Sequence, residues 1–397
     1  MKIALLAPGS LPIPSVLDGA IETLTTHIIE ENETYNKLDL VIFSNYNDQA
    51  LKKSLNYKNT RIIFINCNTI RAKLFNLYFR IIRKIKNSKD LPLNYFLHGC
   101  IKSIKNDSFN FIVLEGGVHQ VLTISKYTNT KIILHVHADI LNVSFPNAKL
   151  IIEKCYSIIT VSNFIRNRVL EIDPQKRDRV HVLRNAVDIN LFDGSKYQMQ
   201  RVMLRLEHKI QDDEKVILFC GRINQGKGIK ELLLACEKLD INYKLLIAGA
   251  SWFNSKNVSK FEREVYQISK RLGDKVIFLG YIPNAKMPEI YSIADISVVP
   301  SVCNDAAPLV PLEALAAGLP VIATNIGGIP EHVTTDVGEL IEVNRNFVDN
   351  LSDAIKKYLV DERYYQRKKS HTKIFIQKFS KEIYYKNFTD LLINKLF

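Results

Sequence analysis

Two carboxylates eight residues apart are the most informative feature of this chain. Asp305 lies in a loop after an apolar run at 296–299, and Glu313 lies on the short helix predicted to follow that loop. We expect Pro308 in the first turn of this helix and Gly318 at its C-terminal end. Carboxylates accept hydrogen bonds from sugar hydroxyls, and a helix N-terminus attracts phosphate. The combination predicts a nucleotide-sugar site.

Two cations stand in a glycine-rich turn at 221–228, after the apolar run at 215–220. A helix is expected to begin near Ile229. A departing diphosphate needs positive charge, which Arg222 would supply as a bidentate fork and Lys227 as a compact point charge. The alternative interpretation is a solvated turn with surface cations.

A glycine pair follows the apolar run at 321–324. Gly327 and Gly328 permit close approach of the backbone to a ligand, and Pro330 is expected to open the next helix. Glu331 follows Pro330, where its carboxylate would compensate the dipole at the helix start.

These residues resemble the family-4 glycosyltransferases, retaining enzymes with the two-domain GT-B fold, which carry Glu-x7-Glu at the positions of Asp305 and Glu313. The resemblance implies that Glu313 holds the ribose hydroxyls of the donor and that Asp305 lies near the transferred sugar. It also implies that Glu331 lies near the donor, the alternative being that its carboxylate only compensates the helix dipole. Asp is one methylene shorter than Glu, and residues 306–308 replace the usual Gly-Phe-Gly, so the sugar subsite is expected to differ. An alternative role for Asp305 is the N-cap of the following helix. The donor-binding loop would also include Ala307, Pro308 and Leu309.

The first half of the chain carries further family positions. Gly19 and Glu22 match a loop that reaches the phosphate and the acceptor, with Asp18 where the family has a glycine. His137 matches a histidine that contacts the donor sugar; the alternative is a structural histidine. Asn185 matches a loop residue between the domains.

Apolar, strand-like runs alternate with helical stretches along the whole chain, which indicates parallel strands covered on both faces. The runs are 2–7, 38–43, 61–65, 111–114, 131–135, 158–161, 180–183, 215–220, 243–248, 275–279, 296–299, 321–324 and 338–341. We predict an α/β fold of two doubly wound Rossmann-like domains facing a cleft. The acceptor-side domain would be 1–190 and the nucleotide-sugar domain 191–370, with the break near 190–211. Residues 371–397 would form a closing helix that, by resemblance, crosses back to the first domain.

Composition and motif content argue against several classes of protein. The 397 residues suit two domains of about 150–200 residues, and 47% apolar with 24% charged residues is typical of a soluble protein. No apolar run approaches the ~20 residues of a membrane span, and the start reads as a strand rather than a signal peptide, which predicts a cytoplasmic protein. The net charge of +13 comes without a nucleic-acid-binding signature, so no nucleic-acid partner is expected. The first strand lacks G-x-G-x-x-G, which argues against a nicotinamide enzyme. The six cysteines lack metal-type spacing and are expected to be free, buried thiols.

Residues 71–89 combine seven basic side chains with many apolar ones. A basic amphipathic helix can lie on an anionic membrane, which would place the protein on the inner face of the membrane. The alternative is a helix packed on its domain.

The resemblance implies a retaining, metal-independent hexosyltransferase with no cofactor. Its donor would be a nucleoside diphosphate sugar, most readily UDP-linked, and its acceptor a saccharide or a lipid-linked molecule in surface-polysaccharide assembly. Arg222 and Lys227 would stabilise the leaving group. The shortened Asp305 motivates a second hypothesis, a noncatalytic partner subunit, and a hydrolase or epimerase on the same fold is a third.

Overall fold

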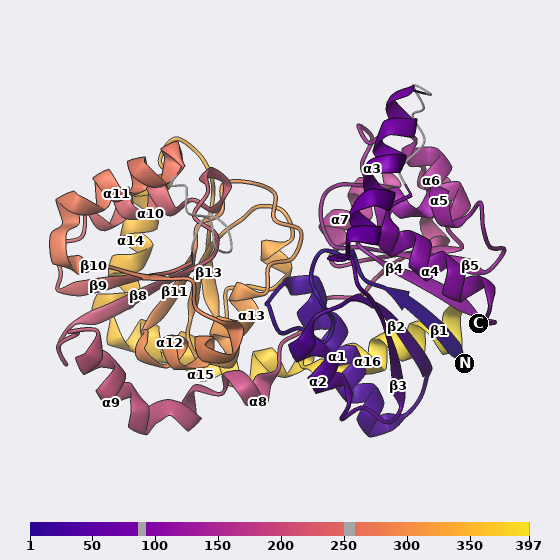
Figure 1. The fold of residues 1–397 in the computed structure, drawn as a ribbon. Helices are drawn as coiled ribbons and strands as arrows, with labels where there is room; N and C mark the ends of the chain where they lie inside the picture. The colour runs from indigo at the N-terminus through magenta and orange to yellow at the C-terminus, as the bar shows by residue number, and fades with distance from the viewer. Residues whose placement is uncertain (86–92, 250–258, 397) are drawn as a thin grey trace. The chain divides into compact units, whose positions relative to one another are not determined.

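A computed structural model describes residues 1–85, 93–249 and 259–396, so 86–89 of the predicted basic helix lie outside the described residues. The chain divides into two compact units, Met1–Asn185 with Lys381–Phe397, and Ala186–Ser380. Residues 190–211, where we expected the break, form helices of the second unit. Residues 371–380 also belong to the second unit, and only the last helices return to the first (Figure 1).

The first unit is built on a seven-stranded parallel sheet with the order β3-β2-β1-β4-β5-β6-β7. Its strands are β1 (Lys2–Leu6), β2 (Asp39–Asn45), β3 (Thr60–Ile65), β4 (Phe111–Glu115), β5 (Lys131–Val136), β6 (Ser157–Thr160) and β7 (Val180–Val182). Its helices are α1 (Ala20–Tyr35), α2 (Asp48–Ser54), α3 (Ile70–Ile85), α4 (Tyr95–Lys105), α5 (Val121–Ile124), α6 (Ala148–Lys154), α7 (Asn163–Leu170) and α16 (Lys381–Asp390).

The second unit is built on a six-stranded parallel sheet with the order β10-β9-β8-β11-β12-β13. Its strands are β8 (Lys215–Cys220), β9 (Tyr243–Ala248), β10 (Val276–Gly280), β11 (Ile296–Val299), β12 (Val321–Thr324) and β13 (Gly338–Ile341). Its helices are α8 (Ile189–Phe192), α9 (Gln198–Glu207), α10 (Ile229–Cys236), α11 (Lys260–Leu272), α12 (Met287–Ile293), α13 (Val310–Ala316), α14 (Phe347–Val360) and α15 (Glu362–Phe375).

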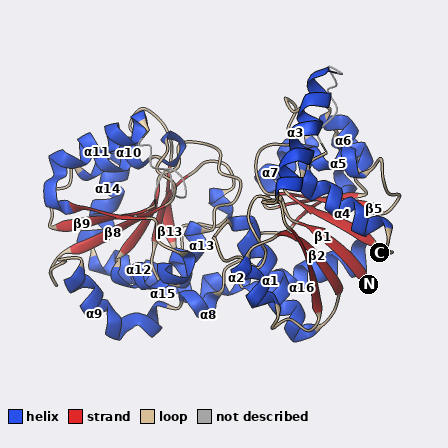
Figure 2. Cartoon of the chain, in the orientation of Figure 1, coloured by secondary structure: helices blue, strands red, loops and turns tan. Residues whose placement is uncertain are grey.

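Alternating residues of each strand in the second unit enter two separate cores. In β8, Ile217 and Phe219 pack with α10, α11 and α14, whereas Val216 and Leu218 pack with α12 and α13. This period of two is what burial of both sheet faces requires. Figure 2 shows helices on both faces of each sheet. The doubly wound architecture predicted from the apolar runs is confirmed, and every predicted strand is present to within two residues at each end.

The strand order of each sheet reverses direction at one place. In the first unit the reversal lies between β1 and β4, and in the second between β8 and β11. Loops that follow such neighbouring strands diverge, which leaves a ligand-binding crevice at their carboxyl ends. Ligand-binding residues are therefore expected at these two switch points.

Candidate active site

At the switch point of the second unit, Lys227 and Asp305 form a bidentate ion pair. Lys227 follows β8 and Asp305 follows β11, so the adjacency of these strands joins residues 78 positions apart. The Lys227 Nζ atom lies 2.7 and 2.8 Å from the two carboxylate oxygens of Asp305, and the Ser301 hydroxyl donates to Asp305 at 2.6 Å. Both members of the pair are about four-fifths buried. Asp305 therefore holds the Lys227 ammonium in a fixed place.

Two glycines make this arrangement possible. Gly228 has a φ of +68°, and a Cβ there would overlap the carbonyl oxygen of Pro300. Gly327 has a φ of +62°, and a Cβ there would overlap the backbone oxygen of Asp305, which also accepts a hydrogen bond from the Gly328 N–H at 2.7 Å. The close approach that we predicted for the glycine pair is thus made to the Asp305 loop.

Arg222 is exposed and, within the described residues, forms no ion pair. The Cys303 thiol is influenced by all three charged residues: burial raises its pKa, the negative charge of Asp305 raises it further, and Lys227 and Arg222 lower it. Cys303 itself is exposed, so the prediction that all six cysteines are buried is wrong, although all six are free thiols. The switch point thus gathers two cations and one carboxylate.

Helix α13 begins two residues later than expected. Its N-cap is Leu309 and Pro311 stands in its first turn, so Pro308 precedes the helix and Asp305 is not its N-cap. Gly318, with a φ of +84°, follows the helix end as predicted.

The remaining donor-side candidates lie close to this loop in sequence. Glu313 is buried in the first turn of α13, where one of its oxygens accepts a hydrogen bond from the Tyr291 hydroxyl at 2.9 Å. Ala307 is buried in the loop before α13. Glu331 ends a short 3-10 helix, Ile329–Glu331, which Pro330 helps to begin.

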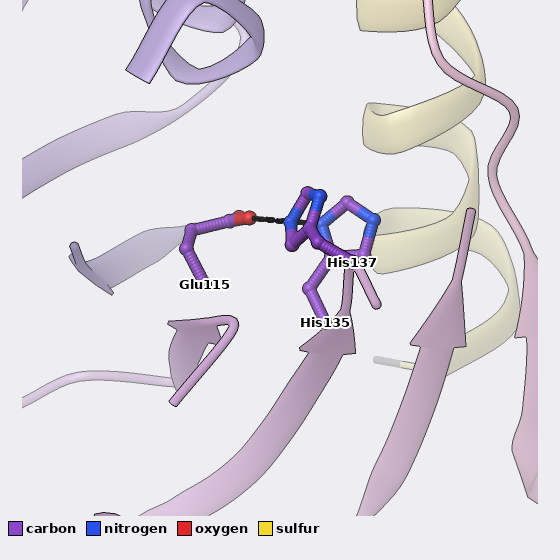
Figure 3. A group of neighbouring side chains, drawn as sticks. All are labelled: Glu115, His135 and His137. Atoms are coloured by element: carbon purple, nitrogen blue, oxygen red, sulfur yellow. Dashed lines mark hydrogen bonds and ion pairs between the residues drawn. The ribbon is translucent and has the colours of Figure 1, made fainter. Parts of the chain in front are cut away.

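At the switch point of the first unit, one carboxylate contacts two imidazoles. Glu115 ends β4, His135 is its in-register neighbour on β5, and His137 follows the end of β5. The Oε2 atom of Glu115 lies 2.6 Å from Nε2 of His137 and 3.0 Å from Nδ1 of His135. Figure 3 shows the carboxylate directed at both rings, whose centroids are 4.0 Å apart. His135 lies inside β5, and His137 lies just beyond its end.

The charges of this cluster follow from its burial. Burial opposes ionisation of Glu115, but the two imidazoles outweigh it and hold the pKa of Glu115 below its ordinary value. Burial and the neighbouring His135 lower the pKa of His137 to about 4, against the opposing effect of Glu115. At neutral pH, His137 is therefore a neutral imidazole beside a carboxylate.

The loop before α1 lies near the same cluster. Gly19 has a φ of +137°, and a Cβ there would overlap the side-chain carboxylate of Glu22. Burial raises the pKa of Glu22, and the negative charge of Glu115 also raises it, against the lowering effect of a backbone hydrogen bond. Asp18 adopts a φ of +57°, the left-handed conformation for which a glycine would be favoured. Asn185 is buried at the end of the first unit.

The candidate residues thus form two groups, one in each unit. Lys227, Arg222 and Asp305 gather after β8 and β11, whereas Gly19, Glu22 and His137 lie near the ends of β1, β4 and β5. Glu115 was missed by sequence reasoning. Its signal was a carboxylate at the very end of an apolar run, followed directly by two glycines.

Glu115, His135 and His137 also form the one group of described residues whose ligand types and spacing could suit a metal ion, with all three ligand atoms within 4.8 Å of one another. The 2.6 Å separation of Glu115 and His137 is a hydrogen-bond distance. Two ligands on one ion at 2.0–2.1 Å would lie at least about 2.9 Å apart. As they stand, Glu115 and His137 are hydrogen-bonded to one another and are not spaced as two ligands of one ion.

Residues 203–374 match the family described as "Glycosyl transferases group 1". The putative glycosyltransferase YtcC of Bacillus subtilis is 27% identical over 375 residues, which are 91% of this chain and 84% of that protein. The lipopolysaccharide 1,2-N-acetylglucosaminetransferase of Salmonella typhimurium is 25% identical over 351 residues, 87% of this chain and 88% of that protein.

Solved structures agree on the fold. HepE of Anabaena, in complex with UDP-glucose, matches with a TM-score of 0.75 and 18% identity over 99% of this chain and all of that one. Sucrose-phosphate synthase of Thermosynechococcus elongatus matches with a TM-score of 0.72 and 20% identity over 99% of each chain. The fold is GT-B, with two Rossmann-like domains, and the comparisons together support a GT-B glycosyltransferase.

Proposed function

We propose that this GT-B glycosyltransferase transfers a hexose from a nucleoside diphosphate sugar to a hydroxyl acceptor, with retention of configuration. The observation that carries the proposal is the group of charges at the β8/β11 switch point, where Arg222 is exposed and Lys227 is held in place by Asp305. A crevice at the carboxyl ends of parallel strands suits a nucleotide, and two cations suit its diphosphate. UDP is the favoured nucleotide because HepE, which shares the fold, binds UDP-glucose.

The proposed reaction proceeds on one face of the sugar. The bond between the anomeric carbon and the diphosphate oxygen breaks, and the acceptor oxygen bonds to the same carbon from the same side. The acceptor proton passes to a diphosphate oxygen. Negative charge grows on the diphosphate as it leaves, so Arg222 and Lys227 would stabilise the transition state more than the ground state. This scheme employs no metal ion and no cofactor.

A thermal-shift panel with UDP, GDP, ADP and CDP tests the donor site. Ligand at 100 times its Kd stabilises a protein by about 2.7 kcal/mol, which raises the melting temperature by several degrees. We expect one nucleotide, UDP first, to shift the wild type and to lose that shift in Arg222→Ala. Arg345→Ala is the matched control because Arg345 is an exposed arginine of the same unit, outside the proposed site. If no nucleotide shifts the wild type, the noncatalytic partner subunit becomes the better interpretation.

We propose further that the acceptor is reached at an anionic membrane surface through α3. One face of α3 packs on its unit through Ala72, Phe75 and Phe79. The opposite face leaves five large apolar side chains exposed, each by 47–77%: Ile70, Leu74, Leu77, Tyr78 and Ile81. Arg71, Lys73 and Arg80 are exposed beside them. None of the described helices is long and apolar enough to cross a membrane. Exposed apolar residues flanked by basic ones are typical of a helix that lies on a membrane surface.

Co-sedimentation with vesicles tests this assignment. Vesicles with anionic lipids should pellet the wild type in a salt-sensitive manner, and neutral vesicles should not. The double variant Leu74→Ser with Leu77→Ser removes exposed side chains only, so it should weaken pelleting without loss of stability. Equal pelleting of the variant and the wild type would contradict a role for α3.

A further inference from the structure

Glu115 is buried at the switch point of the first unit and directs a single oxygen at two imidazoles. Its side chain is 2% exposed, that of His135 is fully buried, and that of His137 is 7% exposed. The Oε2 atom of Glu115 lies within 2.6 Å of His137 and 3.0 Å of His135. Of the three residues, His137 is the most exposed, and it lies just beyond the carboxyl end of β5.

The contact between Glu115 and His137 fixes the position of a proton. An ionised carboxylate can only accept hydrogen bonds, so the Nε2 atom of His137 must carry the hydrogen at 2.6 Å. A neutral imidazole carries one ring proton, so the Nδ1 atom of His137 keeps an unshared electron pair. Within the described part of the chain, no hydrogen bond to Nδ1 of His137 is formed.

We propose that Glu115 is a positioning residue that locks His137 as the Nε2–H tautomer, so that Nδ1 accepts a hydrogen bond from a hydroxyl of the transferred sugar. The inference rests on the proposed function for the identity of the ligand, but the tautomer itself follows from the contact. His135 supports the arrangement, because its ring lies against that of His137 and its Nδ1 atom lies 3.0 Å from the same carboxylate oxygen. Without the carboxylate, either tautomer of His137 could form, and one of them would present a donor to the sugar.

Nitrogen-15 NMR of the full chain with labelled histidine tests the tautomer directly. His137→Gln assigns the signals of His137 by their disappearance. At neutral pH, we expect His137 with a protonated Nε2 and a bare Nδ1 in the wild type, and loss of this single tautomer in Glu115→Gln. A wild-type His137 with a protonated Nδ1, or with both nitrogens protonated, would overturn the proposal. So would one equivalent of metal in the purified protein that is absent from Glu115→Gln.

Kinetics of sugar transfer test the consequence for the reaction. Where a carboxylate orients a histidine that binds a metal, its loss typically lowers metal affinity or activity by about 10- to 100-fold, and we take this range for Glu115. We expect Glu115→Gln to lower kcat by such a factor with a smaller change in KM for the donor. Glu31→Gln removes another buried carboxylate of the same unit, on α1, and should leave kcat near the wild-type value.

Different results would contradict the proposed transferase function and the positioning role of Glu115. Absence of turnover with every nucleotide sugar, while the tautomer is as expected, would overturn the proposed function but not the position of the proton. Normal transfer by Glu115→Gln, at a stability equal to that of the wild type, would overturn the positioning role and leave the glycosyltransferase assignment standing.

Discussion

Replacement of Lys227 and of Arg222 by alanine should separate an effect on folding stability from an effect on the rate of transfer. Both cations stand in the turn after β8, and both are proposed to bind diphosphate. Only Lys227 is already paired, through two contacts with Asp305 and with both side chains about four-fifths buried. Its removal leaves a partly buried carboxylate with Ser301 as its remaining partner among the contacts described above.

The structure sets the expected magnitudes. A fully exposed ion pair contributes about 0–1 kcal/mol, and loss of one member of a fully buried pair costs about 3–5 kcal/mol. The intermediate burial of Lys227 and Asp305 leads us to expect a loss of about 1–2 kcal/mol in Lys227→Ala. Arg222 is exposed and makes no such pair within the described residues, so Arg222→Ala should change stability by less than about 0.5 kcal/mol.

Urea unfolding of the full-length variants measures the differences in free energy of unfolding, and transfer assays measure kcat. Both variants should lose about 10²–10³-fold in kcat, because each removes a group that stabilises the leaving diphosphate. The double variant Lys227→Ala with Asp305→Ala should recover part of the stability but none of the activity. Equal stability of Lys227→Ala and Arg222→Ala would refute the ion pair as a restraint on the site.

Three more outcomes can be measured. The pKa of His137 is about 4 in the folded chain against an ordinary 6.5, so the protein loses stability as the pH falls from 6.5 to 4. Between pH 8 and pH 5, the free energy of unfolding should therefore drop by about 2 kcal/mol more in the wild type than in His137→Gln. Gly228→Ala should cost at least about 2 kcal/mol, seen in the melting temperature, because the left-handed backbone and the carbonyl of Pro300 both oppose a Cβ. Alkylation monitored by mass spectrometry should modify Cys303 before the buried cysteines, and the bound donor nucleotide should slow that reaction.

Much of the fold could be predicted because parallel strands buried on both faces require continuous apolar runs. Tyr243–Ala248 and Val321–Thr324 were predicted at their observed bounds for this reason. The start of α13 was predicted less well. Pro308 and Pro311 are both acceptable near a helix start, and the choice between them depends on how the Asp305 loop packs against Gly327.

The contacts within the candidate site could not be predicted in the same way. Lys227 contacts Asp305 only because β8 and β11 are neighbours, and no local sequence pattern predicts the order of strands in a sheet. The same holds for Glu115, which becomes informative only when β4 is placed beside β5 and His137. Residue types alone indicated the chemistry, whereas tertiary structure decided which charges would be paired.

The return of α16 to the first unit affects the order in which the two units can fold. Residues 186–380 form one uninterrupted unit, and its two ends are joined where the Val187 N–H donates to the Phe379 carbonyl at 2.9 Å. The first unit, in contrast, is complete only when α16 packs on α1, where the Tyr385 hydroxyl donates to Asn32 at 2.6 Å. The second unit can therefore fold from one continuous segment of the chain, whereas the sheet of the first unit is completed only after α16 has been made.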